Sequence, residues 1–376
     1  MPLSLFDPMT LRDVTIPNRI WLAPMCQYSC LERDGMPGDW HLVHLGARAT
    51  GGFGLVLTEA AAVSPEGRIS VHDAGIWNDD QAAAWARIAA FISAQGAVPG
   101  IQLAHAGRKA STFSFRQHGH GTVPLAEGGW RTVAPSALPF DSYATPSALD
   151  QAGIDQVVAD FSAAAARADR AGFAVAELHA AHGYLLHEFL SPLSNRRTDS
   201  YGGSLANRAR LLIDVVRAVR ETWPATKPLF VRFSGTDWTE DGWTVDDTAE
   251  VAGWLADEGV DLVDISSGGN VASAPIPVGP GYQVPLAQQV RTISGLPTAA
   301  VGLITEPGQA ADIVASGQAD AVLLARAALR EPAWPQRAAA ELGLPTTESP
   351  YPAQYVRGAW PEQTVRPSYL DLGRSA

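Results

Sequence analysis

Short apolar runs alternate with longer amphipathic segments along most of this chain of 376 residues. Each run is too short for a helix and is bounded by glycine, proline or polar residues, a pattern typical of a buried strand. Eight such strands are predicted, at residues 20–23, 55–58, 99–103, 173–178, 228–233, 262–265, 298–301 and 321–324. Helices are predicted after most of them, at residues 79–94, 154–171, 204–222, 246–258, 285–293, 306–316 and 332–342. The alternation predicts an α/β fold, a closed (β/α)8 TIM barrel, with a doubly wound sheet of fewer strands as the alternative.

One segment breaks this alternation. Residues 110–150 follow the third strand, are rich in Gly, Pro, Ser and His, and show no sustained helical period. An insertion of this length usually serves as a lid or a pocket wall, and a surface excursion is the simpler alternative. We therefore expect a single barrel domain over residues 1–376, with an insertion at about 110–150 and a C-terminal tail at about 345–376.

The composition excludes several classes of protein. With 39 acidic against 27 basic residues the net charge is −12, which argues against a nucleic-acid or anionic-membrane surface. The sequence has no apolar run of about 20 residues and no secretory signal, so we expect a cytoplasmic protein. The two cysteines, Cys26 and Cys30, are too few for a disulfide framework, a four-cysteine zinc site or a cysteine-ligated iron–sulfur cluster.

The fourth predicted strand is followed by His179, His182 and Tyr184. Two imidazole N–H groups aimed at one point would stabilise negative charge on a carbonyl oxygen, and a tyrosine can donate a proton. Metal binding is the alternative, although the zinc-protease motif places its histidines four apart with a Glu between them. His41 and His44 repeat the spacing inside a predicted helix, and we interpret them as ordinary helix residues.

Closing the barrel would bring the polar groups at the strand ends into one ring. Gly302 and Arg326 follow the last two strands, where barrels often bind phosphate: glycine admits backbone N–H groups and arginine offers a fork of donors. Gln102 and Arg232, on the third and fifth strands, would bind a polar heterocycle at the other end of such a ligand. For Arg232 a structural carboxylate partner is the alternative.

Four segments in this order resemble one known family. They are Pro-Met-Cys-Gln-Tyr-Ser at 24–29, Gln-Leu-Ala-His-Ala-Gly-Arg-Lys at 102–109, His-Ala-Ala-His-Gly-Tyr-Leu at 179–185, and Ser-Pro-Leu-Ser-Asn-Arg-Arg-Thr-Asp at 191–199. Together they resemble the Old Yellow Enzyme family of ene-reductases, in the bacterial thermophilic-like subclass that includes xenobiotic reductases. The resemblance covers almost the whole chain.

The resemblance implies FMN bound non-covalently across the barrel mouth. It matches Ala23, Pro24, Met25, Cys26, Ala60, Gln102, Arg232, Gly302, Ala325 and Arg326 to positions that contact FMN. It matches His179 and His182 to the pair that holds the substrate oxygen, Tyr184 to the proton donor, and Cys26 to a position beside the reactive part of the flavin. It also matches Tyr28 to a substrate contact and Arg357 to an arginine that enters a neighbouring subunit's site, which implies a homodimer or homotetramer.

The implied activity is a ping-pong reaction. NADPH or NADH reduces FMN and leaves, and an α,β-unsaturated carbonyl or nitro compound then has its activated C=C bond reduced. Two alternatives remain open at this stage. One is a metal-dependent barrel hydrolase built on His179 and His182, and the other is a non-catalytic flavin-binding barrel.

Overall fold

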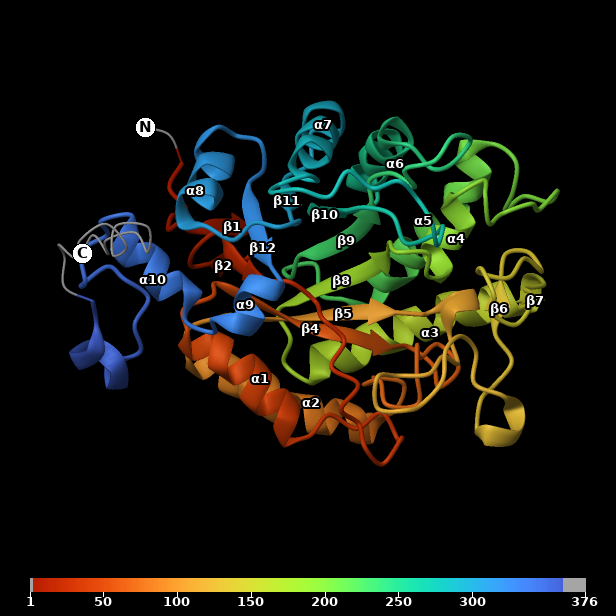
Figure 1. Ribbon diagram of the computed structural model, residues 1–376, viewed down its shortest axis with the longest axis horizontal. Coiled ribbons are helices and arrows are strands. Elements are labelled where there is room, and N and C mark those ends of the chain that lie inside the picture. The colour runs from red at the N-terminus through yellow and green to blue at the C-terminus, as the bar shows by residue number, and fades with distance from the viewer. Residues whose placement is uncertain (1–2, 361–376) are drawn as a thin grey trace, which may run out of the picture.

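The computed structural model describes residues 3–360, and eight parallel strands among them close into a barrel (Figure 1). Each strand pairs with the next barrel strand along the chain, and the last closes against the first. The predicted (β/α)8 fold is confirmed. The barrel strands are β3 (Ile20–Leu22), β4 (Leu55–Ala62), β5 (Val98–Ala104), β8 (Val175–Ala180), β9 (Leu229–Ser234), β10 (Leu262–Ser266), β11 (Thr298–Ala300) and β12 (Ala321–Leu324).

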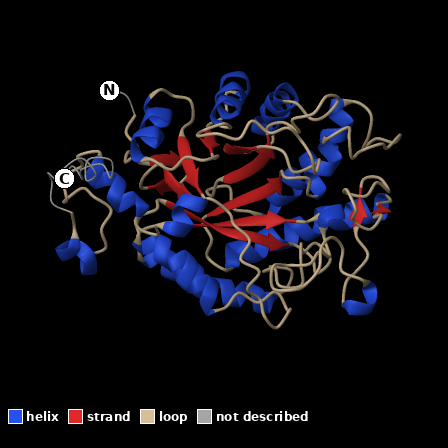
Figure 2. Cartoon of the chain, viewed as in Figure 1, coloured by secondary structure: helices blue, strands red, loops and turns tan. Residues whose placement is uncertain are grey.

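Helices surround the strands on the outside of the barrel (Figure 2). Their starts follow the capping residues in the sequence: the side chains of Asn78, Asp150, Ser204 and Thr244 each accept a hydrogen bond from a backbone N–H of the first turn. The helices are α1 (Asp39–Thr50), α2 (Asp79–Ala94), α3 (Gln151–Arg170), α4 (Leu185–Leu190), α5 (Leu205–Thr222), α6 (Val245–Asp257), α7 (Val284–Ser294), α8 (Pro307–Ala315), α9 (Arg326–Arg330) and α10 (Trp334–Glu341). No helix among residues 3–360 is both long and apolar enough to cross a membrane.

The barrel has an apolar core at its amino end. Trp21 and Phe230 stack there with ring centroids 5.8 Å apart, and each such aromatic contributes about 3 kcal/mol by burial. The hairpin of β1 (Met9–Leu11) and β2 (Val14–Ile16) packs Met9 and Ile16 into the same cluster. Since this end is closed, the polar ends of the strands are left at the opposite, carboxyl end.

Two strands differ from their predicted bounds by two or more residues at one end. β4 continues to Ala62, and its pairing with β5 shifts register between Leu57 and Ala60. Beyond this shift, the side chains do not continue the regular alternation of the strand between the two faces of the sheet. β8 covers residues 175–180 instead of 173–178, because His179 still pairs with Arg232 on β9. His179 therefore lies inside the strand, not just beyond it as predicted.

The insertion at 110–150 is mostly irregular. It contains the 3-10 turn η2 (Leu125–Glu127) and the two-residue strands β6 (Val133–Ala134) and β7 (Ser147–Ala148), which pair with each other. The guanidinium of Arg68 lies 5.2 Å from the ring centroids of both Trp77 and Trp130, and Trp130 donates to the Glu66 carbonyl at 2.8 Å. These contacts fasten the insertion to the loop after β4.

Candidate active site

Strand β8 and its following turn bring three side chains together at the carboxyl end of the barrel. His179 is the next-to-last residue of β8, His182 lies in the turn with a φ of +59°, and Tyr184 directly precedes α4. The imidazole planes meet at 88° with centroids 5.1 Å apart, and the Tyr184 ring packs edge-on against His179 at 5.0 Å. The structure therefore assembles the trio as one cluster.

Hydrogen bonds assign the proton positions of both imidazoles. The backbone N–H of Ala181 donates to Nδ1 of His179 at 3.3 Å, so His179 carries its proton on Nε2. That Nε2 lies 3.3 Å from Nδ1 of His182, whose Nε2 lies 2.7 Å from the Ser266 hydroxyl. A hydroxyl can donate or accept. Ser266 could satisfy either tautomer of His182, but the Nε2–H of His179 donates to Nδ1 of His182, so in this structure His182 carries its proton on Nε2 and donates to Ser266.

All three side chains are uncharged at neutral pH. Burial lowers the pKa of His179 and of His182 well below the ordinary value, and the positive charge of Arg232 lowers both further. Burial likewise raises the pKa of the Tyr184 phenol well above its ordinary value, with the nearby Cys26 and Tyr28 adding to the rise. The trio thus offers neutral N–H and O–H donors.

The loop after β3 contributes the Cys26 thiol and the Tyr28 phenol. Burial raises the pKa of Cys26, and the acidic side chains of Asp73 and Glu59 raise it further, so the group is a thiol and not a thiolate. Tyr28 has a φ of +51°, and its ring packs edge-on against Phe115 of the insertion at 5.5 Å. The insertion therefore borders the site.

A buried pair holds this loop in place. The backbone N–H of Gln27 donates to Oε2 of Glu59 at 2.9 Å, and Nε2 of His41 lies 3.1 Å from Oε1 of the same carboxylate. Nδ1 of His41 accepts from the N–H of Gly38 at 2.9 Å. His41 is a structural residue of a helix, as interpreted from the sequence, and it also connects α1 to the loop that carries Cys26.

A polar layer lies inside the barrel, on β5, β8, β9 and β10. Gln102 donates to Oε1 of Glu177 at 2.7 Å, and Nε of Arg232 lies 2.9 Å from Asp264. Burial raises the pKa of both carboxyl groups. The carboxylate alternative for Arg232 is thus present, although Nη1 and Nη2 make no hydrogen bond with residues 3–360.

A cavity of about 220 Å³ opens after β11 and β12. Its wall includes Gly302, with a φ of +125°, and Arg326 at the start of α9. A Cβ at Gly302 would come within 2.8 Å of the Gln283 amide, so the close packing there requires glycine. Arg326 is exposed and makes no hydrogen bond or ion pair within the described chain.

Residues 4–345 match the NADH:flavin oxidoreductase / NADH oxidase family. The chain belongs to this family. An NADPH dehydrogenase of Geobacillus thermodenitrificans is 48% identical over 355 residues, which cover 94% of this chain and 98% of that protein. The fold is similar to morphinone reductase, with a TM-score of 0.76 and 30% identity over 100% of this chain and 98% of that one. An Old Yellow Enzyme homologue from Zymomonas mobilis matches with a TM-score of 0.75 and 29% identity, over 89% of this chain and 92% of that chain.

These matches confirm the resemblance to Old Yellow Enzymes. The protein is an enzyme, an FMN-dependent oxidoreductase that uses a nicotinamide cofactor.

The described residues fit FMN. The cavity beside Gly302 and Arg326 offers space and a free guanidinium where a phosphate would bind. Nη1 and Nη2 of Arg232 make no hydrogen bond with the described residues and suit the polar edge of a heterocycle. The positions matched to FMN contacts all lie in or directly after β3, β4, β5, β9, β11 and β12. They are Ala23, Pro24, Met25, Cys26, Ala60, Gln102, Arg232, Gly302, Ala325 and Arg326.

Arg357 is not brought to this cluster. It lies exposed in the 3-10 turn η3 (Ala353–Gly358), and the tail before it packs at the amino end of the barrel, where Gln336 donates to the Pro350 carbonyl. Figure 1 shows this part of the tail far from the end of β8. Within one chain Arg357 is therefore separate from His179 and His182. The tail residues 361–376 lie outside the described part of the chain.

Several partners of the site were not predicted. Glu177 and Asp264 lie in the middle of apolar strand runs, where alternation points them into the barrel, and this was the available signal. Lys109 ends one of the family segments, and its Nζ donates to the backbone carbonyls of His182 and Gly269 at 2.8 and 2.9 Å. Asp237 has no local sequence signal that separates it from an ordinary loop residue.

Proposed function

We propose that this protein is an ene-reductase that reduces the activated C=C bond of α,β-unsaturated carbonyl and nitro compounds by a ping-pong mechanism, with NADPH or NADH as the electron donor. The observation that carries the proposal is the cluster of two neutral, perpendicular imidazoles and one protonated phenol at the barrel mouth. This arrangement suits a substrate that gains negative charge on oxygen and a proton on carbon.

FMN, when bound, supplies the hydride that such a reduction requires. The two histidines hold the substrate oxygen. Nε2 of His179 carries a proton, which without substrate is donated to Nδ1 of His182. When the substrate oxygen takes this proton, the proton of His182 is proposed to lie on Nδ1, with Ser266 donating to Nε2. These two N–H nitrogens are 3.3 Å apart, so one oxygen can accept from both. They would stabilise the negative charge that develops there.

Tyr184 is the proposed proton donor to the α-carbon. Its raised pKa keeps the phenol protonated, and its ring is fixed against His179 on one side, with Nζ of Lys109 5.2 Å from its centroid. Tyr28 is proposed as a further substrate contact. Arg357 is proposed to act across a subunit interface in a homodimer or homotetramer, because within its own chain it lies away from the cluster.

Cys26 is proposed to lie beside the reactive part of FMN as a neutral thiol. Its raised pKa argues against a nucleophilic thiolate. A thiol next to the cofactor adjusts the local polarity without adding charge, which would tune the cofactor's reduction potential.

The two alternatives are weaker. A barrel hydrolase needs at least three metal ligands, and no group of three or more His, Cys, Asp or Glu residues within residues 3–360 is arranged to hold a metal ion. A non-catalytic flavin carrier would not need a general acid beside an oxyanion site.

The testing experiment is a visible spectrum of the purified protein, recorded before and after anaerobic addition of NADPH. We expect a flavin band that bleaches with NADPH and returns when cyclohexenone is added. A band that bleaches with NADPH and does not return would overturn alkene reduction while leaving the NADPH-dependent step in place. The lack of any band after loading with FMN would overturn the proposal.

A further inference from the structure

The turn between His182 and Tyr184 is fixed by a hydrogen bond that the proposed chemistry does not use. The backbone N–H of Gly183 donates to Nδ1 of His187 at 2.9 Å. His182 and Gly183 have φ values of +59° and +72°, and non-glycine residues rarely adopt this left-handed region. The conformation therefore needs outside support, and His187 on α4 supplies it.

The direction of this bond fixes the tautomer of His187. An amide N–H can only donate, so Nδ1 of His187 has no proton and Nε2 carries it. Nε2 lies 3.3 Å from Oδ1 of Asp237, and both side chains are fully buried. The contact lacks the alignment of a regular hydrogen bond, so it acts chiefly as an attraction between the N–H dipole and the carboxylate.

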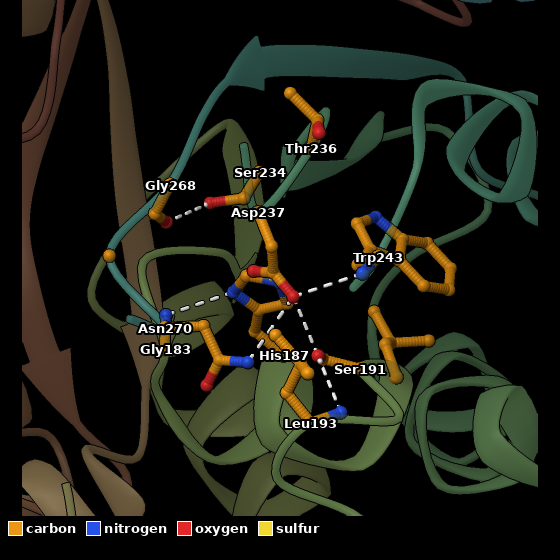
Figure 3. Close-up of polar contacts among 12 residues, drawn as sticks. Gly183, His187, Ser191, Leu193, Ser234, Thr236, Asp237, Trp243, Gly268 and Asn270 are labelled. Carbon is orange, nitrogen blue, oxygen red and sulfur yellow. Dashed lines mark hydrogen bonds and ion pairs between the residues drawn. The ribbon is translucent and has the colours of Figure 1, made fainter. Parts of the chain in front are cut away.

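Hydrogen bonds to the other carboxylate oxygen, Oδ2, stabilise Asp237 as an anion. Oδ2 accepts from the Ser191 hydroxyl at 2.6 Å, from the backbone N–H of Trp243 at 3.0 Å and from the Asn270 side chain at 3.3 Å (Figure 3). Burial alone would raise the pKa of Asp237, but His187 and the hydrogen bonds from Ser191 and Trp243 outweigh it and lower the pKa to about 2. Oδ1 is left facing His187.

We infer that Asp237 and His187 form a positioning pair, which fixes the Gly183 turn and thereby sets His182 and Tyr184 at the places from which they hold the substrate oxygen and deliver the proton. The inference rests on the proposed function. The pair links loops that follow three barrel strands, since His187 and Ser191 come after β8, Asp237 after β9 and Asn270 after β10.

A second buried side chain, that of Ser234, also fixes the conformation of this turn. Oγ of Ser234 accepts from the backbone N–H of His182 at 2.9 Å and donates to the Gly268 carbonyl at 2.7 Å, as Figure 3 shows for the Ser234–Gly268 contact. Two successive amides, those of His182 and Gly183, are thus each bound by a buried side chain. A turn needed only to connect β8 with α4 would not require both.

The pair is tested by substitutions that separate its two contacts. His187→Gln keeps an N–H donor toward Asp237 and removes the acceptor for Gly183. His187→Asn keeps an acceptor near Nδ1 and removes the contact with Asp237. Asp237→Asn keeps the shape and removes the charge. The matched control is Asp261→Asn. Like Asp237, Asp261 accepts several hydrogen bonds, in its case from two arginines and one backbone N–H, but it lies at the amino end of the barrel.

The half-reactions are measured separately on the FMN-loaded enzyme. We expect His187→Gln and Asp237→Asn to slow reoxidation by cyclohexenone by about a hundredfold, because misplacement by about 1 Å costs that much. A solvent isotope effect should appear on this step, since Tyr184 would deliver its proton from a poorer position. Reduction by NADPH needs no proton from Tyr184 and should change much less. The reoxidation rate of His187→Asn should lie between the rates of these variants and that of the wild type.

Amide hydrogen exchange gives a readout independent of turnover. Exchange at Gly183 should accelerate in His187→Gln and Asp237→Asn but not in Asp261→Asn, while the dissociation constant of FMN stays within about twofold. Should Asp237→Asn fail to accumulate in folded form, Ser191→Ala weakens the same carboxylate with less disruption and should give a smaller change of the same kind.

Two outcomes would overturn the inference: unchanged reoxidation in folded His187→Gln, or equal slowing of both half-reactions in proportion to lost stability. A wild-type enzyme that is reduced by NADPH but not reoxidised by any activated alkene would instead overturn the proposed function.

Discussion

The imidazole of His41 lies 3.1 Å from the carboxylate of Glu59, and both side chains are almost completely buried. The other oxygen of Glu59 accepts from the backbone N–H of Gln27, the residue after Cys26. A helix on the outside of the barrel thus determines where the thiol beside the proposed FMN site lies.

Glu59→Gln should loosen this loop. The amide group of glutamine would place an N–H donor against either the His41 N–H or the Gln27 N–H, which costs about 1–3 kcal/mol. The loss of negative charge also removes one cause of the raised pKa of Cys26, so its labelling by iodoacetamide should accelerate. Urea unfolding and labelling rates measure both effects. Glu258→Gln, which disrupts a surface pair with Arg217, should change neither by much.

Tyr184→Phe should slow alkene reduction by about a hundredfold or more, because it removes the general acid while leaving the FMN contacts in place. Stopped-flow reoxidation by cyclohexenone measures the effect, and the flavin content of the purified variant shows whether binding is retained. Tyr201→Phe is the control, since that phenol donates to Asp214 away from the cluster. A Tyr184→Phe enzyme with the wild-type rate would show that another group delivers the proton.

Ser266→Ala should weaken the hold on the substrate oxygen. Without the hydroxyl, nothing donates to Nε2 of His182, and the Nδ1–H tautomer that faces the oxygen loses its support. One hydrogen bond of about 1 kcal/mol corresponds to a rise in KM for the alkene of about fivefold. Ser266→Thr keeps the hydroxyl and should restore most of the affinity. Equal KM values for Ser266→Ala and wild type would count against the tautomer argument.

The pH dependence of alkene reduction should show no step near pH 6.5 that comes from His179 or His182. Burial holds the pKa of His179 and of His182 far below that ordinary value, so neither gains a proton when the pH falls through it. Reoxidation rates between about pH 5.5 and pH 8 test this. A step near 6.5 that His182→Asn removes would contradict it.

The lowered pKa values of the same histidines predict that the folded protein is less stable in acid. Their folded pKa is depressed, and burial also lowers the pKa of His105 to about 4 and of His44 to about 3. Below pH 6.5 the unfolded chain therefore binds more protons than the native one, and the free energy of unfolding should fall as the pH decreases. Urea unfolding at pH 7 and pH 5 measures the difference. A higher free energy at pH 5 would show that the raised carboxyl pKa values, such as that of Glu188 at about 8, dominate instead.

Gly183→Ala should destabilise the folded protein more than Gly172→Ala does. Both glycines have positive φ, +72° and +86°, so alanine at either position costs about 1 kcal/mol of backbone strain. A Cβ at Gly183 would in addition collide with the Gly269 carbonyl, whereas nothing lies within 4 Å at Gly172. We expect Gly183→Ala to lose stability beyond this strain and to slow reoxidation, and Gly172→Ala to lose only stability. Thermal unfolding and stopped-flow kinetics of the pair decide the point, and equal effects would argue against the close approach.

The barrel and the positions of its polar groups could be predicted from the sequence alone. Apolar periodicity and capping residues are local signals, so strands such as 262–265 and helices such as 204–222 were predicted to within one or two residues. The carboxyl ends of parallel strands meet by necessity, which is why Gln102, Arg232 and Gly302 were expected in one ring.

The pairing of these groups could not be predicted, because it depends on how distant segments pack together. His41 with Glu59, Arg232 with Asp264 and His187 with Asp237 are contacts between different elements, and their energies depend on burial that no local pattern records. The protonation state of a side chain likewise depends on the tertiary structure. A histidine in a sequence has an ordinary pKa, and only the packing of β8 against its neighbours, which removes water from His179 and His182, makes both neutral donors.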